Sequence, residues 1–382
     1  MSTRSYLERM HDPGPKRLLS LDGGGIRGVV ALEILLRLET LLRDALGASS
    51  EFVLADYFDY IGGTSTGAII ATGLSLGLSV AQLQKHYAEG ARTMFKSAAF
   101  YKRVYSKHTD IEIAAMLRRV CGETTTFGDP KLRTLLLLVM RNATTDSPWP
   151  LSNNPDAKYS ARDREDCNLD LPLWQLVRAS TAAPVYFPPE TVMIGKRQFI
   201  FVDGAVTMYN NPAFLLFLMA TLPEYRLGWE AGEDNMLLVS VGTGTSANHN
   251  GSLKPSQMTL LYNAAQLPSA LIYGASNEQD MLCRVFGRCR FGSALDRELG
   301  TLSGGVDAKT FAPKKFTYMR YNPDLSAEGL ADLGLRSIRP RHVQRLDSVA
   351  HLTEMQLVGR EYAKSVSLDH FGSFRPARTE QR

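Results

Sequence analysis

The chain has 382 residues, of which 44% are hydrophobic and 21% charged, so it can build an ordinary globular core without a structural disulfide or metal ion. Its 43 basic and 39 acidic residues leave a formal charge of +4, which is too small to indicate a nucleic acid polymer as partner. Four scattered cysteines form no CxxC pair, which predicts neither a zinc site nor a disulfide framework and fits a reducing compartment.

Membrane insertion is not predicted. The N-terminus has no apolar signal region, and the strongest apolar runs, at residues 135–140 and 213–222, are far shorter than the roughly 20 residues that a membrane span needs. We therefore expect a cytoplasmic protein whose contact with a membrane is peripheral.

Strands and helices are predicted to alternate along the first two thirds of the chain. This pattern is typical of a mostly parallel sheet with helices on both faces, a three-layer α/β/α fold. A polar surface excursion is expected at residues 142–170, and beyond residue 246 two helical segments flank a strand. The expected strands are residues 18–21, 58–61, 135–140, 199–202, 237–241 and 316–321, and the expected helices are residues 29–46, 68–76, 80–95, 172–180, 257–281 and 341–364.

A serine stands where a strand turns into a helix. The segment Gly63-Thr64-Ser65-Thr66-Gly67 matches G-x-S-x-G, with an apolar strand before it and an apolar helix after it. That context is the one required of a nucleophile elbow, in which neighbouring glycines leave room for a tight turn. The alternative is a serine that only caps the following helix.

A glycine loop, Asp22 to Gly28, follows the first strand. Three consecutive glycines, Gly23, Gly24 and Gly25, allow bare backbone amides to approach a substrate and stabilise an oxyanion. The same stretch formally satisfies the dinucleotide fingerprint G-x-G-x-x-G, with Glu39 or Asp44 as its acidic partner, but both acids fall inside a predicted helix. With G-x-S-x-G one strand later, the oxyanion interpretation is favoured.

The base that would activate the serine has two candidates. By its order in the chain His249 is the best placed histidine, whereas His342, His351 and His370 have no surrounding motif and are expected at the surface. Asp203 is better marked, because the motif Asp203-Gly204-Ala205 ends an apolar strand, where open α/β sheets place their sites. A simple strand-ending turn is the alternative for Asp-Gly.

Together these three motifs resemble the patatin-like phospholipases. Two further stretches occur in that family's order, "ASTAAPVYFPP" at residues 179–189 and "NNP" at residues 210–212. The resemblance covers residues 17–245 and implies a patatin-like fold with a mostly parallel central sheet. We accordingly expect a catalytic core at residues 17–245 after an N-terminal extension at residues 1–16. A C-terminal helical portion at residues 246–370, packed on the same domain, and a tail at residues 371–382 would follow.

The resemblance implies a lipid acyl hydrolase with a Ser–Asp dyad and with no metal or other cofactor. Ser65 would be the nucleophile and Asp203 its base, with a pKa raised by partial desolvation. The oxyanion hole would be formed by the amides of the glycine loop with Arg27 near it. The remaining motif residues would shape the nucleophile elbow, namely Gly63, Thr64, Thr66 and Gly67, and the base motif, namely Gly204 and Ala205.

The expected substrate is an acyl ester of a phospholipid or another glycerolipid. Tyr186 and Phe187 either hold an acyl chain or belong to the core, and an aromatic and basic stretch at residues 95–107 suits docking at a phospholipid surface or is a solvated loop. Some bacterial relatives are antiphage effectors activated by a cyclic nucleotide, so a cyclic dinucleotide is an expected activator. The rivals are a His249-dependent esterase acting on short esters and a silent module that binds lipid or nucleotide.

Overall fold

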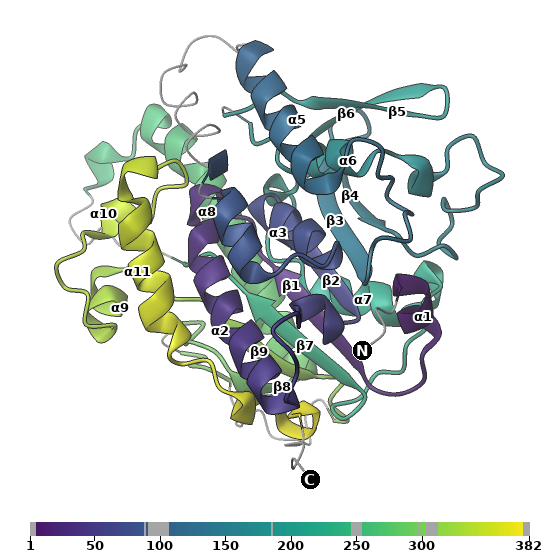
Figure 1. The fold of residues 1–382 in the computed structure, drawn as a ribbon. Helices are drawn as coiled ribbons and strands as arrows, with labels where there is room; N and C mark the ends of the chain where they lie inside the picture. The colour runs from purple at the N-terminus through teal and green to yellow at the C-terminus, as the bar shows by residue number, and fades with distance from the viewer. Residues whose placement is uncertain are drawn as a thin grey trace.

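A single mixed sheet runs through the centre of the molecule, with helices on both faces (Figure 1). The computed structural model describes residues 5–87, 89–90, 107–184, 186–245, 254–296, 298–302 and 312–376. In these residues the sheet has nine strands in the order β5-β6-β3-β2-β1-β7-β9-β8, with β4 paired to β3. The strands are β1 (Lys16–Leu21), β2 (Tyr60–Thr64), β3 (Leu135–Asn142), β4 (Ser147–Ser152), β5 (Glu190–Ile194), β6 (Arg197–Asp203), β7 (Met236–Val241), β8 (Arg288–Phe291) and β9 (Thr317–Tyr321).

The sheet is parallel from β3 through β2, β1, β7 and β9 to β8, and antiparallel where β4, β6 and β5 join it. The predicted three-layer α/β/α fold is thus confirmed, and both C-terminal strands, β8 and β9, belong to the same sheet. The helices are α1 (Tyr6–His11), α2 (Gly28–Leu46), α3 (Thr66–Ser75), α5 (Lys107–Cys121), α6 (Leu173–Ser180), α7 (Ala213–Thr221), α8 (Leu260–Phe286), α9 (Ala327–Asp332), α10 (Pro340–Val343) and α11 (Leu352–Ala363).

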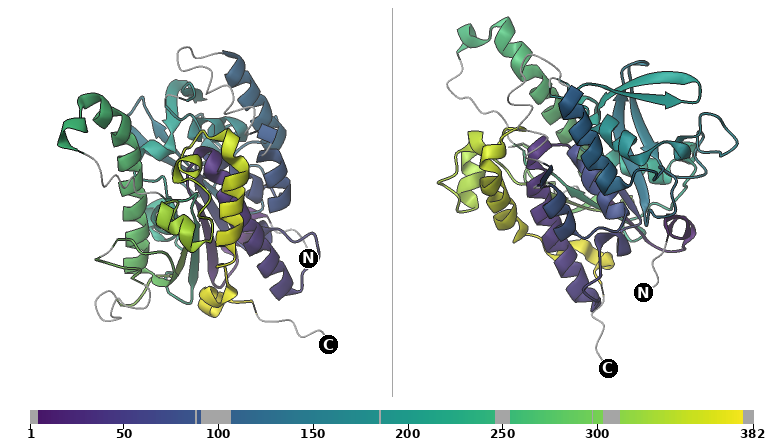
Figure 2. Two further views of the ribbon diagram at one scale, coloured as in Figure 1. Left: turned by 90° about the vertical axis from the view of Figure 1, so that its left-hand side faces the viewer. Right: turned by 45° about the horizontal axis from the view of Figure 1, so that its top comes forward.

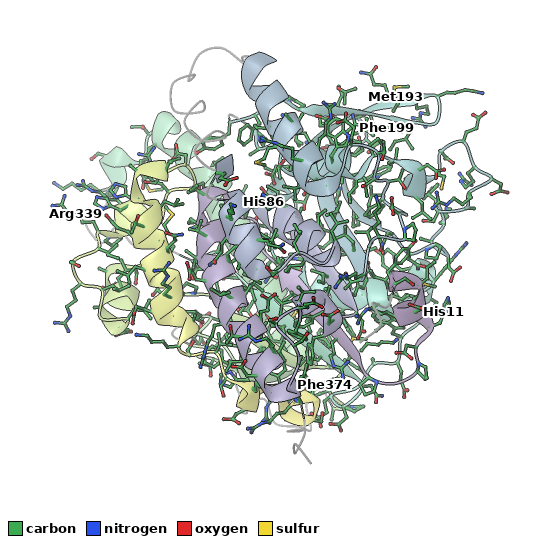
Figure 3. The ribbon with its side chains drawn as sticks, in the orientation of Figure 1. His11, His86, Met193, Phe199, Arg339 and Phe374 are labelled. Carbon is green, nitrogen blue, oxygen red and sulfur yellow. The ribbon has the colours of Figure 1, made fainter. Side chains whose placement is uncertain are left out.

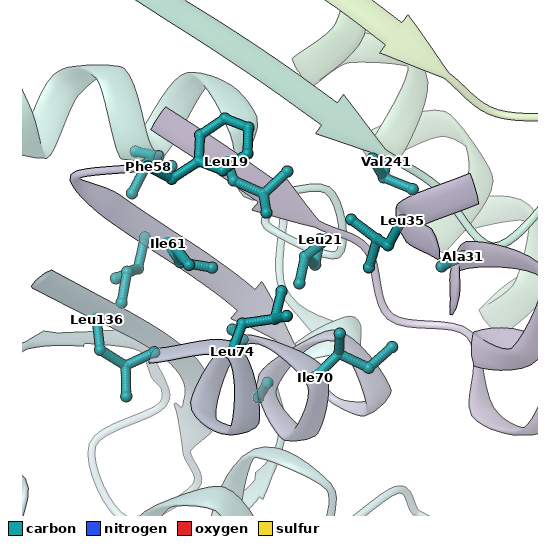
Figure 4. Close-up of a cluster of buried hydrophobic side chains, with 14 of the residues drawn as sticks. Leu19, Leu21, Ala31, Leu35, Phe58, Ile61, Ile70, Leu74, Leu136 and Val241 are labelled. Carbon is teal, nitrogen blue, oxygen red and sulfur yellow. The ribbon is translucent and has the colours of Figure 1, made fainter. Parts of the chain in front are cut away.

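Neighbouring residues of β2 show how the two helical layers cover the sheet. Ile61 points toward the layer of α2 and α3, where it joins Ile70 and Leu74 in a buried cluster (Figure 4). The next residue, Gly62, faces the opposite layer, because a Cβ there would lie 3.1 Å from a methyl carbon of Leu216 on α7. Side chains alternate across a strand, so a strand buried on both faces must be apolar throughout. Two further views show the same layers from the side and with the top of the molecule tilted toward the viewer (Figure 2).

Three strands meet at β3, and this junction positions the site. β4 pairs with residues 137–142 of β3, β2 with residues 135–139 and β6 with residues 140–142. Because β4 overlaps both partners, it occupies one edge of β3, and β2 and β6 share the other edge, one after the other. Thr64 lies opposite Val139 and Asp203 lies opposite Met140. The carboxyl ends of β2 and β6 therefore meet head-on against consecutive residues of β3.

Several predicted elements need correction. The excursion expected at residues 142–170 contains β4 and carries the fully buried Asn153. Pro148 and Pro150 conceal this strand in the sequence, yet they fit an edge strand, which needs no N–H on its outer side. The strand expected at residues 58–61 begins only at Tyr60. The single helical segment expected at residues 341–364 is divided into α10, the 3₁₀ turn η7 (Val349–His351) and α11.

Two expected segments are only partly described. Residues 80–87 and 89–90 of the helix expected at 80–95 are helical, and most of the aromatic and basic stretch at 95–107 lies outside the described residues. At the other end of the chain, Phe371 and Phe374 of the expected tail are buried, and Tyr57 donates a hydrogen bond to the carbonyl of Phe374. None of the helices in the described ranges is both long enough and apolar enough to span a bilayer.

Candidate active site

Ser65 occupies a strained turn between β2 and α3. Its φ of +55° and ψ of −122° lie in a region that non-glycine residues rarely adopt, and such strain persists only where the surroundings impose it. The surroundings are tight here, since a Cβ at Gly63 would lie 2.1 Å from the carbonyl oxygen of Gly67, and a Cβ at Gly67 would lie 2.3 Å from that of Leu21. Thr64 fixes the turn from the other side by donating from Oγ1 to the carbonyl of Tyr209 at 2.6 Å.

Ser180 takes the place of a strand partner where β2 ends. Its hydroxyl accepts the amide of Ser65 at 3.0 Å and donates to the carbonyl of Val139 at 2.5 Å. These two backbone groups would otherwise belong to the ladder between β2 and β3. The hydroxyl therefore satisfies both groups while it lets the chain leave the sheet at Ser65.

Asp203, at the end of β6, contacts the hydroxyl of Ser65. Its Oδ2 accepts a hydrogen bond from Ser65 Oγ at 2.6 Å, and its Oδ1 accepts the amide of Ala205 at 2.8 Å. A Cβ at Gly204 would lie 2.3 Å from the carbonyl oxygen of Val139, so this residue is confined by β3. Burial raises the pKa of Asp203 to about 6, against the opposing effects of these two hydrogen bonds and the charge of Arg178. A raised pKa was predicted for this carboxylate.

The glycine loop lies directly beside Ser65. A Cβ at Gly23 would be 3.3 Å from the Cβ of Ser65, so the backbone of Gly23 lies close to the serine side chain. The amide of Gly23 already donates to the carbonyl of Asn210 at 3.0 Å. In the ranges that the structure describes, no acceptor is seen for the amides of Gly24, Gly25 or Thr66, the last of which begins α3.

Tyr87 ties the glycine loop to the serine turn. Its hydroxyl donates to the carbonyl of Gly25 and shares a 2.7 Å hydrogen bond with Thr66 Oγ1. Gly25 has a φ of +56°, and a Cβ there would lie 2.5 Å from the carbonyl oxygen of Leu346, so a side chain is excluded on two grounds. The site thus combines a serine at a strained turn, a buried carboxylate on its hydroxyl, and a glycine loop in which the amides of Gly24 and Gly25 have no acceptor in the described ranges.

A sequence model of the patatin-like phospholipase family matches residues 19–217, which is more than half of the chain and includes Ser65 and Asp203. The chain belongs to the patatin-like phospholipase family. Its mixed, mostly parallel sheet between two helical layers is accordingly the patatin fold.

The names of curated relatives are those of phospholipases and patatins. This patatin-like chain is 30% identical over 221 residues to a cGAMP-activated phospholipase of Vibrio cholerae serotype O1, covering 54% of this chain and 58% of that protein. A cGAMP-activated phospholipase of Escherichia coli is 28% identical over 253 residues, covering 64% and 65% of the two chains. Patatin-16 of Solanum tuberosum is 29% identical over 265 residues, covering 64% of each. The chain thus spans less than two thirds of each of these relatives.

A buried ion pair that the sequence analysis missed anchors the patatin-like glycine loop. Arg320 on β9 donates from Nη1 to Oδ1 of Asp22 at 2.7 Å and from Nη2 to Oδ2 at 2.5 Å, and its Nη1 also donates to Ser240 Oγ. Burial by itself would lower the pKa of Arg320, but the charge and hydrogen bonds of Asp22 raise it on balance. The signal available in the sequence was a cation within the mostly apolar and aromatic strand predicted at residues 316–321.

Arg27 ends the 3₁₀ turn η1 (Gly25–Arg27), directly before α2, and is half-buried. Burial lowers its pKa to about 10, and Asp22 offsets part of this effect, so the guanidinium keeps its charge at neutral pH. Glu39, which the dinucleotide interpretation needs at the end of a strand, instead lies within α2 and accepts the amide of Val80. Asp44, the other candidate, lies in the same helix, so the phosphate-cradle alternative lacks its acidic partner at the end of a strand.

The histidine contacts that the structure describes lie away from Ser65. His370 contacts Tyr321 and stacks on Phe291, and His249 lies outside the described residues. In the described part of the chain, the side-chain partners of Ser65 and Asp203 include no histidine. Phe187 is buried in the core, whereas Tyr186 is 36% exposed.

Proposed function

We propose that this protein is a lipid acyl hydrolase that cleaves carboxylic esters of phospholipids or other glycerolipids, with Ser65 as nucleophile and Asp203 as general base. The observation that carries this proposal is the 2.6 Å hydrogen bond from Ser65 Oγ to a buried carboxylate whose pKa is raised to about 6. Such a carboxylate is ionised at pH 7 and is a stronger base than an exposed aspartate, which is what proton abstraction from a hydroxyl requires.

The proposed reaction has two steps that share one base. Ser65 Oγ attacks the carbonyl carbon of the ester while its proton moves to Asp203 Oδ2, and the proton then passes to the leaving alcohol as the acyl–oxygen bond breaks. A water molecule next attacks the acyl group on Ser65, giving its proton to Asp203. Collapse of the second tetrahedral intermediate releases the fatty acid and returns the proton to Ser65.

The oxyanion formed in both steps needs donors close to Ser65. We assign this role to the amides of Gly24, Gly25 and Thr66, since the amide of Gly23 is already engaged by Asn210. Arg27 stays charged and follows Gly24 and Gly25 within two or three residues, so it would add a favourable field. Asp22 and Arg320 hold the base of the loop and would contribute rigidity rather than contact with the substrate.

Contact with a lipid surface would be peripheral, in a cytoplasmic protein. Two apolar side chains directly after the Asp203 motif, Val206 and Met208, are 41% and 46% exposed, and Tyr186 is exposed as well. Apolar side chains at the mouth of a site are suited to contact with acyl chains.

We further propose that a cyclic dinucleotide activates the enzyme in antiphage defence. The support is the similarity to two proteins called cGAMP-activated phospholipases, one from Vibrio cholerae and one from Escherichia coli. This proposal expects little fatty-acid release until the activator is added. Strong release that no cyclic dinucleotide alters would remove it and leave the hydrolase itself standing.

The decisive test measures fatty-acid release from phospholipid vesicles, with and without a panel of cyclic dinucleotides. We expect release by the wild type and a loss of about a thousandfold or more in both Ser65→Ala and Asp203→Asn. His249→Ala separates the rival esterase, because a loss as large as that of Ser65→Ala would favour a histidine base. No release by the wild type under any condition would favour short esters as substrates or a silent binding module.

A further inference from the structure

Two histidines and a glutamate come together on the C-terminal helices. His342 lies on α10, His351 ends η7 and Glu354 lies in the first turn of α11. The Nδ1 atoms of the two histidines are each 3.0 Å from a different carboxylate oxygen of Glu354, and the two rings stack with their centroids 3.7 Å apart. The side chains are between 23% and 34% exposed, so they are held in place yet reachable from solvent.

We propose that His342, His351 and Glu354 bind one divalent transition-metal ion, with Zn²⁺ as the best match. One donor atom of each residue lies within 4.8 Å of the other two, as expected for ligands around a common centre. Two imidazole nitrogens and one carboxylate oxygen are a donor set that suits Zn²⁺ and its neighbours, whereas Ca²⁺ and Mg²⁺ favour oxygen alone. A water molecule would complete a tetrahedron.

The convergence of two Nδ1 atoms on one carboxylate favours an ion over a chance contact of surface histidines. Because the rings are stacked with their planes 16° apart, one ring would turn so that both lone pairs meet the same ion. Both rings turn the same nitrogen, Nδ1, toward one carboxylate, and they do so from separate elements of the chain. Hydrogen bonding satisfies this arrangement only if both Nδ1 atoms carry protons. A metal ion would satisfy both nitrogens and the carboxylate with a single centre. Arg345, in the loop between the two histidines, is paired with Asp347.

The proposed metal site joins the two ends of the segment at residues 343–350, and this segment contacts the glycine loop. Between His342 and His351 the chain places the carbonyl of Leu346 against the glycine loop, where it accepts the amide of Ile26 at 2.9 Å. α11, which carries Glu354, packs along α2, and a Cβ at Gly359 would lie 2.9 Å from that of Glu33. A metal ion would thus fasten both ends of this loop to a helix that is fixed on α2.

Fastening the loop would hold Leu346 against Ile26 and so position the glycine loop. These histidines and the glutamate are positioning residues in this scheme, because none of them contacts Ser65 or Asp203 in the described structure. The positioning role rests on the proposed function, whereas metal binding by itself does not.

The test uses the full chain, stripped of metal with a chelator and titrated with Zn²⁺ in a calorimeter. We expect one Zn²⁺ per chain, and affinity about 100-fold weaker or lost in His342→Ala, His351→Ala and Glu354→Gln, since even partners behind a metal's direct ligands are worth about 10- to 100-fold. His86→Ala and His11→Ala are the matched controls. Both are exposed histidines on other elements, and Figure 3 shows His11 at the opposite side of the molecule from Arg339, which precedes α10.

Two further variants guard against misfolding. His342→Gln and His351→Gln keep a side chain that can donate to Glu354 but are poor zinc ligands, so they should fold and still lose binding. No saturable binding by the wild type, or equal loss in the His86→Ala control, overturns the metal site. Calorimetry needs no lipid, so this outcome is independent of whether the protein hydrolyses esters.

Hydrogen exchange of the Ile26 amide tests the positioning role. Zn²⁺ should slow exchange of this amide in the wild type and leave it unchanged in His351→Gln. If Zn²⁺ binds with one ion per chain and exchange at Ile26 does not change, the metal site stands and its role in holding the glycine loop is overturned.

Discussion

Arg320 donates hydrogen bonds to both carboxylate oxygens of Asp22, which lies 298 residues earlier in the sequence, where β1 ends and the glycine loop begins. Both side chains are almost fully buried, with exposed fractions of 4% for Arg320 and 6% for Asp22. A carboxylate without its partner at this depth would be strongly destabilised, so the pair fixes where the loop begins.

Replacing Arg320 by methionine is therefore expected to destabilise the fold by about 3 kcal/mol or more, because a buried charge on Asp22 is left unpaired. The double variant with Asp22→Asn should recover part of that loss, since it leaves no uncompensated charge. Urea unfolding of the wild type, both single variants and the double variant measures this coupling. Simple additivity of the two losses would show that the pair is not coupled.

The pH dependence of hydrolysis should report Asp203. With a pKa of about 6, the carboxylate is ionised and able to accept a proton above pH 6 and is protonated below it, so kcat/KM should fall on the acid side with a midpoint near pH 6. A soluble ester avoids effects of pH on vesicles, and circular dichroism verifies that the fold survives. An acid limb near pH 4, the range of a free aspartate, would contradict the role of burial.

Burial of Asp203 also predicts a gain in stability from Asp203→Asn. The folded-state pKa lies above the unfolded value, so the ionised carboxylate opposes folding at pH values above about 6, and this effect vanishes as the pH falls toward 4. The variant should thus unfold at a higher temperature than the wild type at pH 8 and show a smaller advantage at pH 4.5. An equal or lower Tm for the variant at pH 8 would argue that the hydrogen bond from Ser65 outweighs the cost of burying the charge.

Ser65→Gly should make the protein more stable and inactive. Glycine adopts a φ of +55° without the steric penalty that a serine pays, which is of the order of 1 kcal/mol or more. Thermal unfolding of Ser65→Gly is compared with that of Ser65→Ala, which loses the hydroxyl but keeps the strain. If the two variants unfold at the same temperature, the turn does not store strain that glycine relieves.

Tyr87→Phe should lower kcat about tenfold with little change in fold. The variant removes both hydrogen bonds that join Gly25 to Thr66, and so it loosens two of the proposed oxyanion donors relative to each other. Tyr57→Phe is the matched control, because it also removes a buried tyrosine hydrogen bond, to Phe374 at the end of the chain. An equal effect in the control would assign the loss to general destabilisation.

The sequence by itself determined the local elements and their order. Mostly apolar runs became β1, β3 and β7. The glycines around Ser65 predicted a turn, which the structure shows. Both could be predicted because backbone geometry and burial leave a signature within a few residues. β4 escaped prediction since its prolines and polar residues suit an edge strand but read locally as a loop. The Ser–Asp chemistry of the site stays a proposal, though both side chains were named from motifs alone.

Only the tertiary structure decided which distant groups meet. The head-on arrangement of β2 and β6 on β3 brings Asp203 to Ser65, and the engagement of Gly23 by Asn210 leaves Gly24 and Gly25 as the free amides of the loop. The pairing of Asp22 with Arg320 and the grouping of His342, His351 and Glu354 are likewise set by the tertiary structure, because no residue's partner can be read from its neighbours in sequence. Such contacts depend on how the helical layers pack on the sheet. A short stretch of sequence does not reveal that packing, because it involves residues far apart in the chain.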